Sequence, residues 1–404
     1  MRILMACAAF PPFIDGGGPI SALMIAKLIQ QSGHELEVVN VADREEREIY
    51  DGIQVQRLST LNIDWNYRLP RPWWKRLLWH ALENFNPRAF VVMRRQIRRF
   101  RPDIVLTDSI ENVNVATWAA ARSCGVPVAH ILRSAFLLCW KGSMHRASGN
   151  CSKVCTSCQC TSLGKKFSSR FVDAVIGETR FIVTKHTSNG YFPHASAHVI
   201  PGLLPSKIAP APRGLVEGRP IRMGYLGVLD EVKGLDILAE ALHLLGPTDQ
   251  AQFFIAGTAN SPYGKGLPAK FPSATRFVGW VRPDEFLREI DVLVMPSILQ
   301  EAFGRVIIEA FGSGVPVIGS SAGGIPETIE PGKSGLLFPV GDAPALASLL
   351  RDIIADPAQL ARLSEGALEA AYRYTPEKIS SAYDAIFTRL QSTELSRLSL
   401  RDAN

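Results

Sequence analysis

Short runs of apolar residues alternate along the chain with longer stretches in which apolar residues recur at helical spacing. Such runs are typical of strands buried on both faces of a parallel sheet, and such stretches are typical of the helices that cover it. The pattern predicts strands over residues 2–10, 34–42, 102–109, 126–132, 174–180, 221–227, 252–258, 275–280, 291–297, 315–320 and 334–340. It predicts helices over residues 19–33, 113–125, 181–190, 235–245 and 376–391. This alternation predicts an α/β fold with doubly wound parallel sheets.

A stretch rich in proline and glycine, residues 201–220, interrupts the alternation near the middle of the chain. Such a composition is typical of a linker, and a chain of 404 residues is too long for one hydrophobic core. We therefore predict two Rossmann-like domains, residues 1–205 and 221–375, joined by a linker over 206–220. Residues 376–404 follow as a terminal segment that contains the last predicted helix.

The composition is that of a soluble globular protein, with 47% hydrophobic and 20% charged residues. No apolar stretch reaches the roughly 18–20 residues that a membrane-spanning helix requires. The apolar N-terminus, MRILMACAAFPPF, continues into DGGGP and not into a small-residue cleavage site. We interpret it as a buried strand and not as a signal peptide, which predicts a cytoplasmic protein.

The most informative stretch, residues 301–327, reads EAFGRVIIEAFGSGVPVIGSSAGGIPE. Glu301 follows a predicted strand, and Glu309 lies about one turn inside the helix that begins after Gly304. Both carboxylates should therefore lie at the carboxyl end of a strand, where open α/β sheets bind ligands. A carboxylate there can accept hydrogen bonds from the vicinal hydroxyls of a ribose or a hexose. Because backbone N–H groups at the helix start suit anions as well, the pattern indicates a sugar-nucleotide site.

Each of these features has an ordinary structural explanation when it is taken alone. A glutamate in the first turn of a helix is favourable with the helix dipole. A glutamate in a loop is usually solvated, and glycine followed by Val-Pro is a common way to end a helix and start a strand. The functional interpretation is favoured because these features occur together and because GGIPE, residues 323–327, follows the next predicted strand.

The order E-x7-E with an internal F-G, then G-x-G-V-P and G-G-x-P-E, resembles the donor site of the glycosyltransferase family 4 enzymes. The resemblance covers most of the chain and is strongest between residues 223 and 338. It implies a GT-B fold, in which two Rossmann-like domains face each other across a cleft, and retaining transfer without a catalytic metal. It further implies that the C-terminal helix of residues 376–404 packs back on the N-terminal domain, the acceptor side. It also implies that Glu309 holds the donor ribose and that Glu301, with the amides of Phe303 and Gly304, holds the transferred sugar.

Two glycine-rich loops extend this expected donor site. In the first half, Gly17 and Gly18 precede a proline at a helix start, where glycines let the backbone approach a diphosphate. Alone, such a loop more often forms only a tight turn, and the resemblance is what implies the donor phosphates. In the second half, the loop GVLDEVKG begins at Gly227, and its Lys233 matches the family lysine that contacts the donor diphosphate.

Val228 stands where the family usually has an arginine, so one phosphate contact is missing from the expected set. Either Arg305 supplies it, or the leaving group is stabilised differently. A solvated Lys233 at a helix start would be slightly unfavourable with the helix dipole, which favours the phosphate interpretation. Glu301 and Lys233 are the expected catalytic residues.

The segment GVPVAHILRSAFLLC, residues 125–139, resembles a family segment on the acceptor side of the sugar pocket. Arg133 takes the place of the family histidine, which suggests an anionic group nearby, such as an acceptor phosphate or the donor's own. His130 lies earlier, within the predicted strand, and we interpret it as a structural histidine.

Four of the seven cysteines fall within ten residues, a density that packing does not explain. In a cytoplasmic protein such a cluster indicates a metal before a disulfide, and zinc held by four thiolates is the default. The preferred ligands are Cys139, Cys151, Cys155 and Cys158, because some family members carry a similar cysteine-bearing insertion. An iron–sulfur site and a redox role are the alternatives, because the spacing is not that of a standard zinc finger.

Positive charge is concentrated in the first half of the chain. Residues 1–212 carry 26 Lys and Arg against 15 Asp and Glu, a net +11, and the remainder carries 18 against 23, a net −5. Residues 65–101 carry ten basic residues and one acidic residue, Glu83. No nucleic-acid recognition fold accompanies this charge, so nucleic acid is not the expected partner.

The basic segment predicts two amphipathic helices. The first has an apolar face of Trp74, Leu78, Leu82 and Phe85; the second sets Met93, Ile97 and Phe100 opposite Arg94, Arg95, Arg98 and Arg99. Basic amphipathic helices with tryptophans suit an anionic membrane surface. The alternative is two helices docked on the core with solvated arginines.

Together these features predict a retaining glycosyltransferase that moves a sugar from a UDP- or GDP-linked donor to a saccharide or lipid-linked saccharide. Surface polysaccharide or glycolipid biosynthesis is the expected setting, with the enzyme peripheral on the inner face of the membrane. No cofactor is expected for catalysis, and one zinc is expected to be structural. A nucleotide-sugar epimerase of the same fold and a non-catalytic membrane- or metal-binding adaptor are the alternatives.

Overall fold

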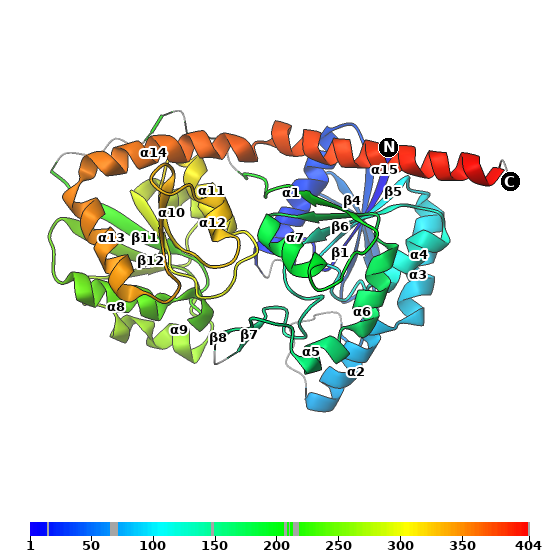
Figure 1. Cartoon of the computed structure of the whole chain (residues 1–404), viewed down its shortest axis with the longest axis horizontal. Helices are drawn as coiled ribbons and strands as arrows, with labels where there is room; N and C mark the ends of the chain where they lie inside the picture. The colour runs from blue at the N-terminus through cyan, green and yellow to red at the C-terminus, as the bar shows by residue number, and fades with distance from the viewer. Residues whose placement is uncertain are drawn as a thin grey trace. The chain divides into compact units, whose positions relative to one another are not determined.

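The computed structural model describes residues 1–13, 16–64, 72–146, 149–205, 208–209, 211–212 and 218–402, with the side chains described as far as residue 393 (Figure 1). The chain forms two compact units. Unit 1 comprises Met1–Arg146, Cys151–Leu203 and Pro376–Asn404, and unit 2 comprises Ala147–Asn150 and Leu204–Thr375. Most of the predicted linker and the first seven residues of the predicted basic segment, 65–71, lie outside the described residues.

Unit 1 is built on an eight-stranded sheet with the order β10-β9-β6-β5-β1-β2-β4-β3. Its strands are β1 (Arg2–Cys7), β2 (Glu35–Val41), β3 (Glu46–Tyr50), β4 (Ile53–Leu58), β5 (Ile104–Asp108), β6 (Val128–Leu132), β9 (Ala174–Gly177) and β10 (Ser196–Val199). Only the pair β3 and β4 is antiparallel among these neighbours. The central strands are buried along nearly their whole length, which explains why they are apolar at successive positions and do not alternate.

The helices of unit 1 pack around this sheet (Figure 1). They are α1 (Gly17–Gln31), α2 (Trp73–Asn84), α3 (Pro87–Phe100), α4 (Ala116–Ser123), α5 (Thr156–Cys160), α6 (Leu163–Ser168), α7 (Arg180–Thr187) and α15 (Pro376–Asp402). Two two-residue strands, β7 (His145–Arg146) and β8 (Gly149–Asn150), precede α5 in the chain, and the second of them belongs to unit 2. The terminal helix α15 places Tyr383 and Phe387 in the same hydrophobic core as β1 and α1, so it belongs to unit 1 by packing.

Unit 2 is built on a six-stranded, all-parallel sheet with the order β13-β12-β11-β14-β15-β16. Its strands are β11 (Ile221–Leu226), β12 (Ala251–Ala256), β13 (Arg276–Gly279), β14 (Val292–Met295), β15 (Val317–Ser320) and β16 (Gly335–Phe338). Its helices are α8 (Leu235–Leu245), α9 (Pro262–Gly266), α10 (Pro283–Glu289), α11 (Arg305–Gly312), α12 (Ile325–Thr328), α13 (Ala343–Ala355) and α14 (Pro357–Ala371). Two hydrophobic clusters contain the inward residues of this sheet and its helices.

The predicted fold class is confirmed, because both units are α/β with doubly wound sheets. The apolar pattern missed the hairpin of β3 and β4 and the edge strand β10. Those strands are half exposed or carry polar residues inside: Arg57 on β4, for example, is buried and donates to Asn40 and to the backbone carbonyl of Pro11. No helix in the described parts of the chain is long and apolar enough to cross a membrane.

Candidate functional site

Glu301 lies in the loop that follows β14, and two side chains hold its carboxylate. Its Oε1 atom accepts a hydrogen bond from Lys233 Nζ at 2.7 Å and another from Ser297 Oγ at 2.9 Å. Lys233 comes from the loop between β11 and α8, 68 residues earlier in the chain. The two expected catalytic residues therefore form one ion pair at the carboxyl end of the unit 2 sheet, with side chains 15% and 30% exposed.

Gly234 explains how the lysine loop comes so close to the strand end. It adopts a left-handed conformation (φ 73°), and a Cβ atom there would lie 1.9 Å from the carbonyl oxygen of Pro296. The loop is also tied to the segment after β14, since the amides of Ile298 and Leu299 both donate to the carbonyl of Val232 at 3.0 Å. Only glycine fits where the lysine loop passes the Pro296 carbonyl, so packing explains why Lys233 is followed by a glycine.

Glu309 lies on α11, which begins after Gly304. Gly304 is left-handed (φ 90°) and occupies the N-cap position of this helix. Arg305 is the first residue of the helix, and Glu309 lies one turn after it. Arg305 Nε donates to Glu309 Oε1 at 2.8 Å, and the Glu309 side chain is only 10% exposed. Arg305 therefore lies beside the predicted ribose-binding carboxylate. That it replaces the arginine absent at position 228 stays a prediction.

The neighbours of Glu301 fix its backbone as well as its side chain. Phe303 is buried, with its ring 6.0 Å from that of Tyr374, so its side chain belongs to the core and only its amide could face a ligand. The Gly324 amide donates to the Glu301 carbonyl at 2.8 Å, and a Cβ atom on Gly323 would lie 2.4 Å from that carbonyl oxygen. The GGIPE motif thus supports the loop that carries Glu301.

Two residues near Glu301 were not expected from the sequence. Ser297 joins Glu301 to the backbone of the lysine loop, and Ser320 Oγ donates to the Ser297 carbonyl at 2.5 Å. Neither serine stands in a pattern that marks it, because both act through contacts between segments far apart in sequence.

Gly227 follows β11, and its amide donates to the Ala256 carbonyl at 3.0 Å. Val228 is half exposed beside it.

In unit 1, Gly17 and Gly18 belong to the exposed first turn of α1, and no acidic residue lies in that turn. A Cβ atom on Gly18 would meet nothing within 4 Å, so packing does not explain why this residue is a glycine. Helix α1 extends over 15 residues. Its N-terminus has the positive end of the dipole that the predicted contact with donor phosphates needs.

Arg133 follows β6 and is paired with two carboxylates of its own unit. Its Nε and one terminal nitrogen donate to the two oxygens of Asp108 at 2.6 and 2.8 Å, and the other terminal nitrogen donates to Glu178 at 2.8 Å. The guanidinium is nearly buried, and its charge is more than matched by these partners. Asp108 and Glu178 are thus anionic groups beside Arg133 within its own unit, and its place on the acceptor side stays a prediction.

His130 is a buried structural residue. Its Nδ1 atom lies 2.8 Å from Thr107 Oγ1, and its ring stacks on Phe192 with centroids 5.7 Å apart. Burial, with a contribution from the nearby His186, lowers the pKa of His130 to about 3. The imidazole is therefore neutral near pH 7.

The cysteine cluster is only partly assembled. Cys139 Sγ and Cys158 Sγ lie 3.7 Å apart and are both buried, whereas Cys155 Sγ lies 2.8 Å from a terminal nitrogen of Arg146 and 3.2 Å from Ser157 Oγ. Among the residues that the structure describes, no group of three or more His, Cys, Asp or Glu side chains is arranged to hold a metal ion. Cys158 thus lies next to Cys139 and also interacts with Cys155, and the four-thiolate zinc site stays a prediction.

The two basic helices behave differently. On α3, Met93, Ile97 and Phe100 are buried, and Arg95, Arg98 and Arg99 are exposed, whereas Arg94 is half-buried. This helix therefore docks on the core, which is the alternative interpretation. On α2, Trp79, His80 and Glu83 face the protein, and the predicted apolar face is largely exposed. The prediction that both helices offer apolar surface to a membrane is therefore wrong for α3.

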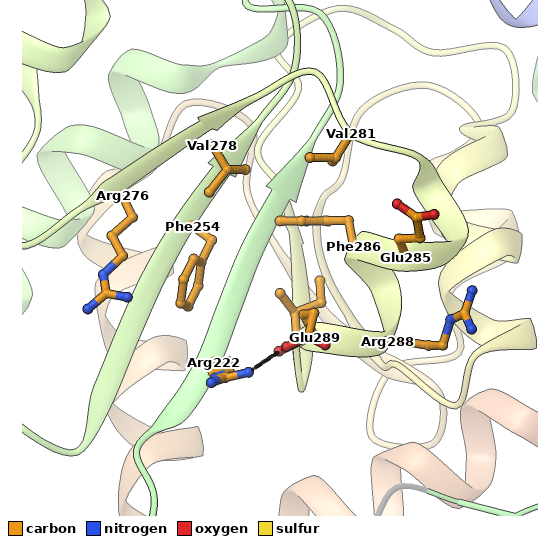
Figure 2. A pocket seen from close by; sticks show the side chains of 10 residues that line it. Arg222, Phe254, Arg276, Val278, Val281, Glu285, Phe286, Arg288 and Glu289 are labelled. Atoms are coloured by element: carbon orange, nitrogen blue, oxygen red, sulfur yellow. Dashed lines mark hydrogen bonds and ion pairs between the residues drawn. The ribbon is translucent and has the colours of Figure 1, made fainter.

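A pocket of about 570 Å³ lies beside β12, β13 and α10 in unit 2 (Figure 2). Its lining includes Arg222 and Arg276, near the starts of β11 and β13, and also Val278 and Val281, near the end of β13 and just after it. Arg222 donates to Glu289 at 2.8 Å across the pocket, as Figure 2 shows. None of the predicted donor-site residues lines it.

Two models of glycosyltransferase domains match the sequence of this chain. The one described as "Glycosyl transferase 4-like domain" matches residues 16–202, and the one described as "Glycosyl transferases group 1" matches residues 220–356. The chain belongs to glycosyltransferase family 4. Glycosyl transfer, the activity expected from the donor-site motif, is confirmed by this membership, and nothing in the matches supports an epimerase or an adaptor.

Relatives of this glycosyltransferase match it over different lengths. An "Uncharacterized 42.6 kDa protein in cps region" of Klebsiella pneumoniae is 26% identical over 330 residues, which cover 81% of this chain and 87% of that protein. A D-inositol 3-phosphate glycosyltransferase of Streptomyces avermitilis is 36% identical over 180 residues, 41% of this chain and 39% of that protein. The chain thus spans most of the first relative and less than half of the second.

Solved structures share the fold of this glycosyltransferase at low identity. A sucrose-phosphate synthase from Thermosynechococcus elongatus has a TM-score of 0.73 at 19% identity, covering 97% of this chain and all of that one. HepE of Anabaena in complex with UDP-glucose has a TM-score of 0.69 at 19% identity, covering 96% of this chain and all of HepE. These likenesses confirm the GT-B fold class.

Proposed function

We propose that this enzyme transfers a hexose from a nucleotide-sugar donor to a saccharide or lipid-linked saccharide, with retention of anomeric configuration. The observation that carries the proposal is the pair of contacts at the carboxyl end of β14, Lys233 with Glu301 and Arg305 with Glu309. In each contact a carboxylate, which can accept hydrogen bonds from sugar hydroxyls, lies beside a cation, which can bind phosphate. A nucleotide sugar presents both hydroxyls and phosphates to its binding site.

The roles of the residues follow from this chemistry. Glu309 would accept hydrogen bonds from the ribose hydroxyls, and Glu301 those of the transferred sugar. In the reaction the bond between the anomeric carbon and the phosphate oxygen breaks, and the electron pair leaves with the nucleoside diphosphate. Lys233 and Arg305 would stabilise the charge on that leaving group. The acceptor hydroxyl then bonds to the anomeric carbon on the face that the diphosphate left and gives its proton to a phosphate oxygen of that leaving group, which retains the anomeric configuration. The reaction needs no catalytic metal.

The identities of donor and acceptor rest on relatives and on charge. HepE of Anabaena was solved with UDP and with UDP-glucose, which supports a UDP-linked donor, with a GDP-linked donor as the alternative. The Klebsiella relative is described by its cps region, which supports an acceptor in surface polysaccharide or glycolipid biosynthesis. We further propose that the enzyme is cytoplasmic and works at the inner face of an anionic membrane, where a lipid-linked acceptor would be presented.

A panel of nucleotide sugars tests the reaction. The purified protein should release the nucleoside diphosphate slowly from its donor by hydrolysis and should do so faster with the acceptor. Nuclear magnetic resonance of the first product formed should give the same anomeric configuration as the donor. Epimerised nucleotide sugar without release of nucleotide would contradict the proposal, and so would the absence of binding to every donor in the panel.

A further inference from the structure

Helix α2 exposes an apolar face that the described residues of unit 1 leave uncovered. Five large apolar side chains on or next to this helix are exposed: Trp73, Trp74, Leu77, Leu78 and Phe85. Trp73 and Phe85 are 74% and 77% exposed. Their spacing puts them on one side of the helix, with the exposed Ala81 between them. Tryptophan, leucine and phenylalanine clustered in this way are unusual on a surface that only meets water.

The orientation of α2 is fixed by polar contacts on its opposite side. Glu83 is fully buried, and its Oε1 atom accepts a hydrogen bond from Asn62 Nδ2 at 2.8 Å. Trp79 Nε1 donates to Asn112 Oδ1 at 3.3 Å, and the ring of His80 lies 5.5 Å from that of Trp140. Turning the helix to bury its apolar face would break these contacts, so the exposure of that face belongs to the folded state.

Helix α6 lies next to α2 and adds two exposed apolar side chains. It packs against α2 (Figure 1), and Asn84 at the end of α2 joins the two: its Oδ1 atom accepts hydrogen bonds from the amides of Gly164 and Lys165. Gly164 has no room for a side chain, because a Cβ atom there would lie 2.5 Å from the Asn84 carbonyl oxygen. On the outer side of α6, Leu163 and Phe167 are exposed as well. We call the exposed side chains Trp73, Trp74, Leu77, Leu78, Phe85, Leu163 and Phe167 the α2–α6 apolar face.

Basic side chains flank the α2–α6 apolar face. Lys75 Nζ lies 5.6 Å from the Trp74 ring centroid, and the Arg170 guanidinium lies 4.2 Å from that of Phe167. Lys166 is exposed beside them. Residues 139–172 contain six Lys and Arg and no acidic residue, and the one acidic residue of 72–101 is the buried Glu83. The surroundings of the face are therefore positive.

We propose that the α2–α6 apolar face inserts into the interfacial layer of an anionic lipid bilayer. This inference rests on the proposal that the enzyme works at a membrane, and it names the surface that would meet the lipid. Tryptophan and leucine on a helix that lies in the interface plane gain from burial among acyl chains, and the flanking lysines and arginines gain from anionic headgroups. A symmetric contact with a second copy fits less well, because it would bring two basic rims together.

Vesicle sedimentation with the full chain tests the proposal. The wild type should bind vesicles of phosphatidylcholine and phosphatidylglycerol, and the binding should weaken with salt without vanishing, because only the electrostatic part is screened. Replacing Trp73, Trp74, Leu77 and Leu78 by serine should abolish the binding at high salt. Replacing Lys75, Arg76, Lys166 and Arg170 by glutamine should weaken binding at low salt about fivefold for each charge near the surface.

Equally exposed apolar residues elsewhere provide the matched controls. Trp280→Ser in unit 2 and Ile49→Ser in unit 1 remove side chains that are 71% and 74% exposed, and neither should change the binding. Fluorescence of the wild type should be quenched by lipids brominated in their acyl chains, and the Trp73→Phe, Trp74→Phe double variant should lose most of that quenching.

Three results would overturn the assignment of this surface. The wild type could ignore anionic vesicles at low salt, the serine variant could bind like the wild type, or the serine substitutions could convert a lipid-free dimer into a monomer, which would assign the face to a second copy. Donor hydrolysis separates this inference from the proposed reaction, since the serine variant should retain it. Loss of vesicle binding with hydrolysis intact concerns only the surface, and absence of hydrolysis in the wild type concerns only the reaction.

Discussion

Replacing Glu309 by alanine should weaken donor binding while leaving the fold intact. The Glu309 carboxylate is 10% exposed and accepts one hydrogen bond from Arg305 at 2.8 Å. If it also holds the two vicinal hydroxyls of the donor ribose, its removal leaves them without a partner inside a partly desolvated site. Net loss of hydrogen bonds to a charged group costs about 1–3 kcal/mol, which corresponds to a decrease of about 5- to 150-fold in kcat/KM.

The cost in stability should be much smaller. Arg305 and Glu309 are one helical turn apart, and such a pair contributes about 0.3–0.5 kcal/mol to a helix. The melting temperature of the variant should therefore stay within about 2–3 °C of the wild type, so that a loss of activity reports on the site. Glu309→Gln keeps one acceptor oxygen and should recover part of the loss.

Kinetics of donor hydrolysis, with competition by the free nucleoside diphosphate, measure the effect. Because ribose is common to donor and product, Glu309→Ala should weaken both by the same factor. Glu289→Ala is the matched control: Glu289 also pairs with an arginine at 2.8 Å in unit 2 but is 72% exposed and lies just before β14, at the other end of the strand. A folded Glu309→Ala protein with wild-type kcat/KM and wild-type competition by nucleotide would refute the ribose assignment.

Three further predictions follow from the site and from its surroundings. Glu301→Gln should lower kcat/KM for the donor by about tenfold or more yet leave competition by the free nucleoside diphosphate unchanged, because Glu301 is assigned to the sugar; equal weakening of both would contradict that. Elemental analysis should find about one zinc per chain, held by four thiolates with no open position, and a metal-free protein with free thiols at all four predicted cysteines would disprove the site. The neutral, buried His130 has a pKa of about 3, below the value of about 6.5 in the unfolded chain, so its stabilising contribution is present above pH 6.5 and is lost as the pH falls. Urea unfolding from pH 6.5 to 4.5 should show a loss of about 2 kcal/mol that His130→Gln lacks, and equal pH slopes for both proteins would argue against the buried neutral state.

The apolar pattern of the sequence determined most of the regular elements, because burial on both faces of a parallel sheet leaves a continuous apolar run that needs no knowledge of the neighbours. Helix α8 was predicted over the same residues, 235–245, that the structure gives it. The hairpin of β3 and β4 escaped prediction because β3 is a half-exposed edge strand, and its apolar signal is weak. The donor-site motif was readable as well, since Glu301 and Glu309 lie on one short segment.

Contacts between distant segments were decided only by the tertiary structure. The pairing of Lys233 with Glu301 joins residues 68 positions apart, and Arg133 finds Asp108 and Glu178 on two other strand ends. The two basic helices also differ in a way that only the tertiary structure shows. Each helix has an apolar side, but the spacing of apolar residues does not indicate whether other parts of the protein cover that side. Met93 of α3 is buried in the core, whereas Trp73 of α2 is exposed. Asn62 and Asn112 bind the opposite side of α2, and that contact leaves its apolar face outward.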